Sequence, residues 1–329
     1  MMKVVVYSTN TYDKTHFEAT ADHAFTFEYV GTALSIDTVH LAADAFAVCI
    51  FVNDDASRPV LEKLAAMGVK GIAIRAAGHD QTDHEAAHQL GLHVAYVPAY
   101  SPHSIAEHTV ALLLALTRKI VEADKRVKSY NFKLDPLVGF NLHHKKVGIV
   151  GIGKIGGITA KILQGFGCTL LGYDPKPNEE YAKAYGLQYV SIDELIQNAD
   201  IIIIQAPLNA ATKHLINTDS IAKMKDGVFI INTGRGAIIN TADAIEGLKS
   251  GKIGALGIDV YENEKGLFFN DHTMSIPTDD VFARLLTFKN VLVTGHMAFL
   301  TTNALTSIVQ TTLENLNAWK DGRNAVNEL

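Results

Sequence analysis

Apolar and polar positions follow two periods that alternate along the whole 329-residue chain. Short runs rich in β-branched residues are bounded by turn residues, and between them apolar residues recur every three or four positions. This alternation predicts strand–helix–strand units and parallel sheets. The expected strands are KVVVYS, AVCIFV, GIAIRA, HVAYVP, KVGIVG, TLLGYD, DIIIIQ, VFIINTG, ALGIDVY and VLVTGH.

The central expected strands are apolar almost throughout, with Ile201 to Ile204 as the extreme case. A strand covered by helices on both faces has this pattern, so the fold class is α/β with doubly wound parallel sheets. Directly after KVGIVG, apolar residues from Ile155 to Phe166 recur at helical spacing, which predicts an amphipathic helix that ends near Gly165 and Gly167.

One further helix is expected from Ser104 to Lys128, opening with a capping box between Ser104 and Glu107. Such a helix is long enough to cross between domains. Prolines at 98 and 102 place the first domain boundary near residue 100, and a last helix without a later strand follows VLVTGH. We therefore expect two domains, one formed by residues 1–100 with 300–329 and the other by residues 101–299.

Charge and composition remove several classes of function. With 29 Lys and Arg against 35 Asp and Glu, the net charge of −6 predicts no binding to nucleic acid or to anionic membranes. The longest apolar windows are too short to span a bilayer, and the start of the chain lacks a signal-peptide pattern. The two cysteines, Cys49 and Cys168, lie in apolar segments and are too few for a disulfide framework. A cytoplasmic protein is expected.

The sequence GIGKIG follows an expected strand and opens a helix, which is the context of a dinucleotide-binding turn. Gly151 allows the tight turn, Gly153 allows close approach of a pyrophosphate, and Gly156 allows the helix to pack on the sheet. Asp174 ends the next strand, where its carboxylate can bind ribose hydroxyls and repel a 2′-phosphate. NAD is therefore the expected cofactor.

Other polar residues also fall at strand ends. Pro207, Arg235, Asp259 and His296 each lie at or just past the carboxyl end of a separate strand, as Asp174 does. Open α/β sheets bind ligands at this edge, so we expect these residues to share one crevice.

Seven segments of the chain resemble the D-2-hydroxyacid dehydrogenases, most closely the bacterial fermentative D-lactate dehydrogenases. They are CIFVNDDASRPVLE, VPAYSPHSIAEHT, GIGKIG, INTGRGAIIN, GIDVYENE, LFFND and TGHMAFLT. The resemblance implies a Rossmann-type NAD-binding domain, a discontinuous flavodoxin-like substrate domain and an active-site cleft between them. It also implies assembly into a homodimer or homotetramer.

The same resemblance implies a set of site residues. It assigns catalysis to Arg235, Glu264 and His296, and it assigns binding of the substrate carboxylate to backbone amides in the stretch from Arg75 to Gly78, with Ala76 and Ala77 between them. Tyr100 is expected to face the substrate. Cofactor contacts are expected, besides the three glycines, at Lys154, Ile155, Asp174, Ala206, Pro207, Thr212, Thr233, Gly234, Arg235 and Asp259.

These side chains suit the reduction of a 2-oxo acid. His296 is a suitable proton donor because a nearby Glu264 carboxylate favours the imidazolium form. Arg235 can form a paired, charge-assisted contact with the substrate carboxylate. Bulky Tyr100 and Phe299 are expected to close the pocket around a methyl group, which favours pyruvate as substrate and D-lactate as product.

Alternative functions remain open at this point. The substrate is either pyruvate or a larger 2-oxo acid, and some proteins of this fold sense NAD without catalysis, although this chain has no basic patch or added module for DNA. His84 and His88 match the HExxH pattern of zinc peptidases, but they lie in a charged helix without a spaced third ligand. His143 and His144 lie in an expected turn. No metal is expected.

Overall fold

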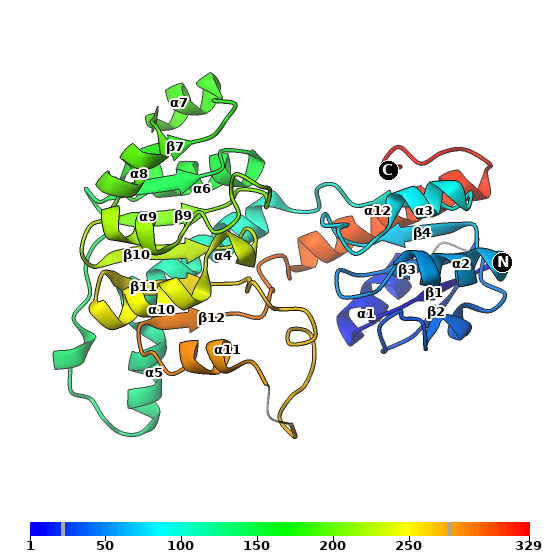
Figure 1. Ribbon diagram of the computed structural model, residues 1–329, viewed down its shortest axis with the longest axis horizontal. Coiled ribbons are helices and arrows are strands. Elements are labelled where there is room, and N and C mark those ends of the chain that lie inside the picture. The colour runs from blue at the N-terminus through cyan, green and yellow to red at the C-terminus, as the bar shows by residue number, and fades with distance from the viewer. Residues whose placement is uncertain (21–23, 276–277) are drawn as a thin grey trace. The chain divides into compact units, whose positions relative to one another are not determined.

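The computed structural model describes residues 1–20, 24–275 and 278–329. The chain divides into two compact units, shown in Figure 1. Unit 1 consists of Met1–Ser101 and Leu300–Leu329, and unit 2 consists of Pro102–Phe299. Each unit has its own parallel sheet and its own helices.

Unit 1 contains a five-stranded sheet in the order β2-β1-β3-β4-β5, in which every neighbouring pair is parallel. This is the flavodoxin-like strand order. The strands are β1 (Met2–Val6), β2 (Phe25–Tyr29), β3 (Ala47–Ile50), β4 (Gly71–Ile74) and β5 (His93–Tyr96). The helices are α1 (Thr11–Ala19), α2 (Arg58–Ala66), α3 (His84–Gln89) and α12 (Thr302–Lys320).

The C-terminal helix α12 belongs to the core of unit 1. Its residues Val309 and Leu316 are buried in one cluster with Val4 and Val6 of the first strand. The last residues of the chain continue this association, because the backbone N–H of Leu329 donates to the carbonyl of Val94 at 2.9 Å. The two ends of the sequence therefore fold together, as the discontinuous flavodoxin-like domain requires.

Unit 2 contains a seven-stranded parallel sheet in the order β12-β11-β10-β9-β6-β7-β8, which includes the Rossmann order. The strands are β6 (Lys146–Val150), β7 (Thr169–Tyr173), β8 (Leu187–Tyr189), β9 (Ile201–Ile204), β10 (Val228–Asn232), β11 (Ile253–Ile258) and β12 (Val291–Val293). The helices are α4 (Pro102–Thr117), α5 (Ile120–Lys128), α6 (Lys154–Gly165), α7 (Glu179–Tyr185), α8 (Ile192–Asn198), α9 (Thr218–Lys223), α10 (Thr241–Ser250) and α11 (Asp280–Leu285). The predicted fold class is confirmed in both units.

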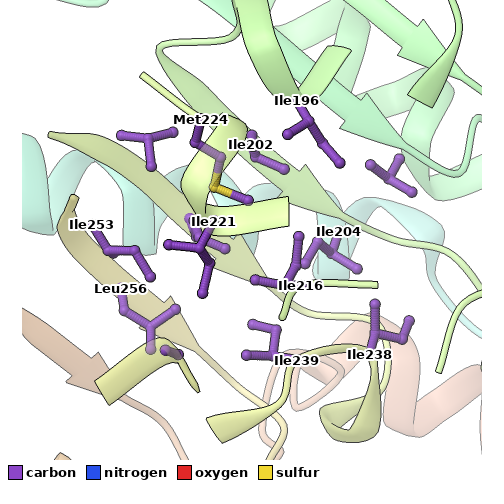
Figure 2. Close-up of a cluster of buried hydrophobic side chains, with 14 of the residues drawn as sticks. Ile196, Ile202, Ile204, Ile216, Ile221, Met224, Ile238, Ile239, Ile253 and Leu256 are labelled. Atoms are coloured by element: carbon purple, nitrogen blue, oxygen red, sulfur yellow. The ribbon is translucent and has the colours of Figure 1, made fainter. Parts of the chain in front are cut away.

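Strand β9 explains why the apolar run of four isoleucines folds as a central strand. Successive side chains point to opposite faces of a sheet. Ile202 and Ile204 are buried in a cluster with Ile221 of α9, part of which is drawn in Figure 2. Ile201 and Ile203 are buried in a second cluster, which contains residues of α4 and α6. Helices thus cover both faces of the strand.

The single long helix predicted from Ser104 to Lys128 is wrong in two respects. The helix begins earlier, at Pro102, and Ser104 is buried inside its first turns. The helix is also interrupted, because α4 ends at Thr117 and Lys119 adopts a left-handed conformation with φ of 52° before α5 begins. Gly139 packs against the end of α4, where a Cβ at position 139 would lie 2.0 Å from the Thr117 carbonyl oxygen.

Candidate active site

The glycine turn after β6 has the shape that a dinucleotide requires. Gly151 has φ of 93°, and a Cβ at this position would lie 2.7 Å from the backbone N of Ala206. A Cβ at Gly156 would lie 2.1 Å from the carbonyl oxygen of Gly151. By contrast, a Cβ at Gly153 would meet no atom within 4 Å. Space is therefore left at Gly153, where α6 begins without a side-chain cap, and a pyrophosphate fits this cradle.

Asp174 follows β7 and holds the glycine turn in place. One of its carboxylate oxygens accepts from the N–H of Ile152 at 2.8 Å, and the other accepts from the N–H of Lys176 at 2.8 Å. An ionised carboxylate has about four lone-pair sites, so both oxygens keep capacity for further donors such as ribose hydroxyls. The residues of this turn fit an NAD molecule.

Polar contacts also fix the loops after β9 and β10. The hydroxyl of Thr212 donates to the Pro207 carbonyl at 2.7 Å and accepts from the N–H of Asn209 at 2.9 Å. The hydroxyl of Thr233 lies 2.7 Å from that of Thr109 on α4. The loops expected to contact the cofactor are therefore fixed by their own hydrogen bonds.

Arg235 lies just beyond β10 and is held by its backbone. The side chain of Asn232 donates to the Arg235 carbonyl at 2.9 Å and accepts from the N–H of Gly234 at 3.0 Å. The Arg235 Nη1 atom donates to the Gly234 carbonyl at 3.0 Å. Across residues 1–20, 24–275 and 278–329, no carboxylate forms an ion pair with Arg235. Its charge is available for an anionic ligand.

The side chains of His296 and Glu264 contact each other. The Nδ1 atom of His296 lies 2.8 Å from Oε1 of Glu264, and Oε2 of Glu264 accepts from the N–H of Tyr261 at 3.0 Å. Both side chains are partly exposed, at 23% and 27%. Within the described part of the chain the Nε2 atom of His296 has no hydrogen-bond partner. Because Glu264 orients the Nδ1 side of the ring, the Nε2 side is the one that can exchange a proton with a substrate.

Asp259 at the end of β11 positions the loop that carries His296. Its buried carboxylate accepts from the backbone N–H groups of Met297 and Ala298, both at 2.9 Å, and from the hydroxyl of Thr294. The Asp259 carbonyl accepts from the N–H of His296 at 2.7 Å. Burial raises the pKa of the Asp259 carboxyl, but hydrogen bonds from His108, Thr294 and these amides outweigh it, and the pKa lies below its ordinary value.

The predicted site residues fall in both units. Arg235, Glu264, His296 and Phe299 belong to unit 2, whereas Ala76, Ala77, Gly78 and Tyr100 belong to unit 1. In unit 1 the stretch after β4 is anchored by Arg75, whose buried guanidinium donates to the Ser8 carbonyl at 2.7 Å and lies 3.4 Å from Asp13. The substrate and cofactor contacts assigned to these residues stay predictions.

Each of the two histidine motifs includes a histidine that contacts another histidine. His84 begins the short helix α3, and its Nε2 atom lies 2.9 Å from Nδ1 of His79. The rings of His143 and His144 are adjacent, with centroids 3.7 Å apart. Among the residues that the structure describes, no group of three or more His, Cys, Asp or Glu side chains is placed to hold a metal ion.

Sequence reasoning missed His108 and Thr294, which both contact Asp259. The Nε2 atom of His108 lies 3.0 Å from the Thr294 hydroxyl and 3.5 Å from the Asp259 carboxylate. His108 stands between the polar residues Glu107 and Thr109, before the apolar stretch of α4, so its local sequence gave no signal. Its partners lie far along the chain, so no spacing indicated the contact.

Comparisons with known proteins agree with this geometry. Residues 110–298 match the family described as D-isomer specific 2-hydroxyacid dehydrogenase, NAD binding domain. The D-lactate dehydrogenase of Escherichia coli is 47% identical over 329 residues, which is 100% of both chains. The pyruvate reductase of Chlamydomonas reinhardtii has a TM-score of 0.95 at 44% identity, covering 99% of this chain and 98% of that one. D-lactate dehydrogenase with NAD⁺ from Lactobacillus jensenii has a TM-score of 0.84 at 30% identity, covering 100% and 99%.

The family match confirms the prediction of NAD as the cofactor and of an oxidoreductase as the class of enzyme. The aligned region covers the whole chain and therefore both units. The protein therefore belongs to the D-isomer specific 2-hydroxyacid dehydrogenase family.

Proposed function

We propose that this protein reduces pyruvate to D-lactate with NADH. The observation that carries the proposal is the 2.8 Å contact between His296 and Glu264, which leaves the Nε2 side of the imidazole without a protein partner in the described chain. Relatives at 44–47% identity are named as a pyruvate reductase and a D-lactate dehydrogenase, which supports the choice of substrate. NADH, when bound, supplies the hydride that reduces the carbonyl carbon.

The residues of this chain supply the proton and the charge. His296 donates a proton from Nε2 to the carbonyl oxygen as the C–O bond becomes single, and Glu264 stabilises the imidazolium before that transfer. Arg235 binds the substrate carboxylate with its guanidinium, because planar N–H donors match the two carboxylate oxygens. The same positive charge stabilises the oxygen on which negative charge develops.

The proposed cofactor contacts surround the glycine turn and the neighbouring strand ends. Gly151, Gly153 and Gly156 give the backbone close access to the pyrophosphate, and Asp174 accepts from the ribose hydroxyls. The remaining proposed contacts are Lys154, Ile155, Ala206, Pro207, Thr212, Thr233, Gly234, Arg235 and Asp259.

The proposed substrate contacts explain a preference for a small 2-oxo acid. Backbone N–H groups at Ala76, Ala77 and Gly78 are the proposed contacts of the substrate carboxylate in unit 1. Tyr100 and Phe299 are bulky, and Phe299 is only 7% exposed. Such side chains leave room for the methyl group of pyruvate and exclude branched or aromatic groups.

The test is oxidation of NADH, with NADPH in parallel, against pyruvate, 2-oxoisocaproate, phenylpyruvate and hydroxypyruvate, followed by chiral separation of the product. Fast NADH-specific formation of D-lactate is expected. Preference for a larger 2-oxo acid would keep the mechanism and overturn the pocket argument. NADH binding without turnover of any substrate would favour the NAD-sensing alternative.

We further propose that a second copy of the chain covers α5 and the loop after it. Figure 1 shows this segment extending from unit 2. Its exposed apolar side chains are Ile120, Val121, Val127, Tyr130, Phe132, Leu134 and Val138, of which Tyr130 is 87% exposed. Apolar patches of this kind mark protein interfaces. Light scattering of the wild type and of Phe132→Ser with Leu134→Ser tests the proposal, since a dimer or tetramer should dissociate in the double variant.

We place the protein in the cytoplasm. Cys49 and Cys168 are both free thiols, which is typical of proteins in a reducing compartment. Among the described residues no helix is both long and apolar enough to cross a membrane. Fractionation of cells that express the protein tests this placement.

A further inference from the structure

Two adjacent residues of α4 reach the carboxyl ends of four neighbouring strands. Thr109 lies 2.7 Å from the hydroxyl of Thr233, beyond β10, and accepts from the side-chain amide of Gln205, beyond β9, at 3.1 Å. His108 contacts Asp259 beyond β11 and Thr294 beyond β12. Thr109 therefore faces the loops assigned to the cofactor, and His108 faces the loop that carries His296.

The contact of His108 forms a directed chain of hydrogen bonds. The Thr294 hydroxyl has one proton, and it donates that proton to the Asp259 carboxylate, which accepts only. The Nε2 atom of His108 at 3.0 Å from the same hydroxyl oxygen must therefore be the donor. The order is His108 to Thr294 to Asp259, and Asp259 in turn holds the backbone N–H groups of Met297 and Ala298.

This chain ends at Met297 and Ala298, the two residues that follow His296. His296 has φ of 55°, a left-handed conformation that residues other than glycine adopt only when their surroundings fix it. The Asp259 carboxylate is 1% exposed, so water does not replace a donor that is removed from it. Removal of the N–H donor of His108 is therefore expected to displace the backbone at His296.

We propose that His108 is a positioning residue that orients His296 through Thr294 and Asp259. The proposal rests on the proposed function, in which His296 donates the proton. It concerns geometry alone, because His108 touches neither His296 nor, in the proposed mechanism, the substrate. The chemical requirement at position 108 is an N–H donor at the place of Nε2.

The experiment compares His108→Leu, which lacks the donor, with His108→Gln, whose side-chain amide reaches to the same place. A 1 Å misplacement of a catalytic group costs up to about 10²-fold in rate, so we expect kcat of His108→Leu to fall by about 10-fold or more. NADH affinity should stay unchanged, and His108→Gln should recover most of kcat. The matched control is His103→Leu, an exposed histidine on the same helix.

Two further measurements keep the test decisive. Thr294→Val breaks the same chain at its middle residue, and its effect should add less than fully to that of His108→Leu, because both substitutions remove donors from one hydrogen-bond network around Asp259. The ring signals of His296 in NMR spectra of histidine-labelled enzyme, assigned with His296→Asn, should move in His108→Leu and not in His108→Gln. This NMR measurement does not depend on catalytic turnover.

The outcomes separate the inference from the proposed function. If the wild type reduces no 2-oxo acid, the proposed function fails, and the NMR signals alone decide the role of His108. If the wild type turns over and His108→Leu keeps its kcat and unmoved His296 signals, the inference is overturned. The inference would also be overturned if NADH affinity and kcat both fell in His108→Leu and neither recovered in His108→Gln. That result would show that His108 only stabilises the fold.

Discussion

The imidazole of His296 is held on its Nδ1 side by Glu264 at 2.8 Å, while its backbone has φ of 55°. The two residues lie in different loops, Glu264 after β11 and His296 after β12. Glu264 is itself fixed, since its second oxygen accepts from the N–H of Tyr261 at 3.0 Å. The orientation of the ring is therefore set before any substrate arrives.

Replacing His296 with Asn should abolish most of the activity without disturbing the fold. Asn tolerates a left-handed backbone, so the loop keeps its conformation. Loss of a general acid costs about 10²-fold or more in kcat, whereas NADH affinity should change little. Steady-state kinetics and an NADH titration measure both effects. The matched control is His144→Asn, an exposed histidine with φ of 63°, and equal kinetics for the two variants would remove His296 from the mechanism.

Two glycines of the turn after β6 should respond differently to the same substitution. A Cβ at Gly153 meets nothing within 4 Å, so Gly153→Ala should fold with wild-type stability and bind NADH weakly, because the methyl group occupies the approach of the pyrophosphate. A Cβ at Gly156 would lie 2.1 Å from a backbone oxygen, so Gly156→Ala should lose about 1–3 kcal/mol of stability. Thermal unfolding without cofactor and NADH titration distinguish the two. Wild-type NADH affinity in Gly153→Ala would contradict the proposed cradle.

Shortening Phe299 should widen the range of substrates. Each methylene that a pocket accepts or rejects changes kcat/KM by about 10- to 200-fold. We therefore expect the kcat/KM ratio of 2-oxoisocaproate to pyruvate to rise by about 10-fold or more in Phe299→Ala. Because Phe299 is 7% exposed and its loss can weaken the fold, Phe299→Leu provides a milder second variant. An unchanged ratio in two folded variants would assign Phe299 to the core rather than to the pocket.

The fold could be predicted from the sequence because each sheet repeats one local pattern. Ile201 to Ile204 are apolar at every position, and this property alone requires helices on both faces. Strands β2 and β8 were not predicted, since their half-exposed, mixed sequences, such as FTFEY from Phe25 to Tyr29, resemble loops. The interruption of the long helix at Lys119 was not predicted, because no proline or glycine marks it in the sequence from His103 to Lys128.

Those parts of the candidate site that a local sequence motif identifies could be predicted. The turn at Gly151 and the strand ends at Arg235 and His296 follow from position, because parallel strands place their carboxyl ends at one edge. The supporting hydrogen bonds of Asp259 were not predictable, since its donors come from α4, from the end of β12 and from the backbone after it. Such contacts form only in the folded protein, and the spacing of residues in the sequence does not indicate them.

Asp259 also makes the stability of the protein depend on pH. Its pKa is lower in the folded state than its ordinary value of about 3.9, so the folded protein prefers the carboxylate. The resulting stabilisation is fully present above about pH 4 and is lost as the pH falls through the lower folded pKa. Asp259→Asn lacks this contribution, because an NH2 group, which donates and cannot accept, replaces one of the two oxygens that accept from the surrounding donors.

We therefore expect Asp259→Asn to be less stable than the wild type by about 1–3 kcal/mol at pH 7, the cost of unmatched buried donors. The difference should narrow as the pH falls below about 4 and toward the lowered folded pKa, where Asp259 takes up a proton and also presents a donor. Calorimetric measurement of Tm for both proteins at a series of pH values tests this. A Tm difference that stays constant from pH 7 to below pH 4 would show that the charge of Asp259 contributes nothing, and that only the shape of its side chain holds the loop of His296.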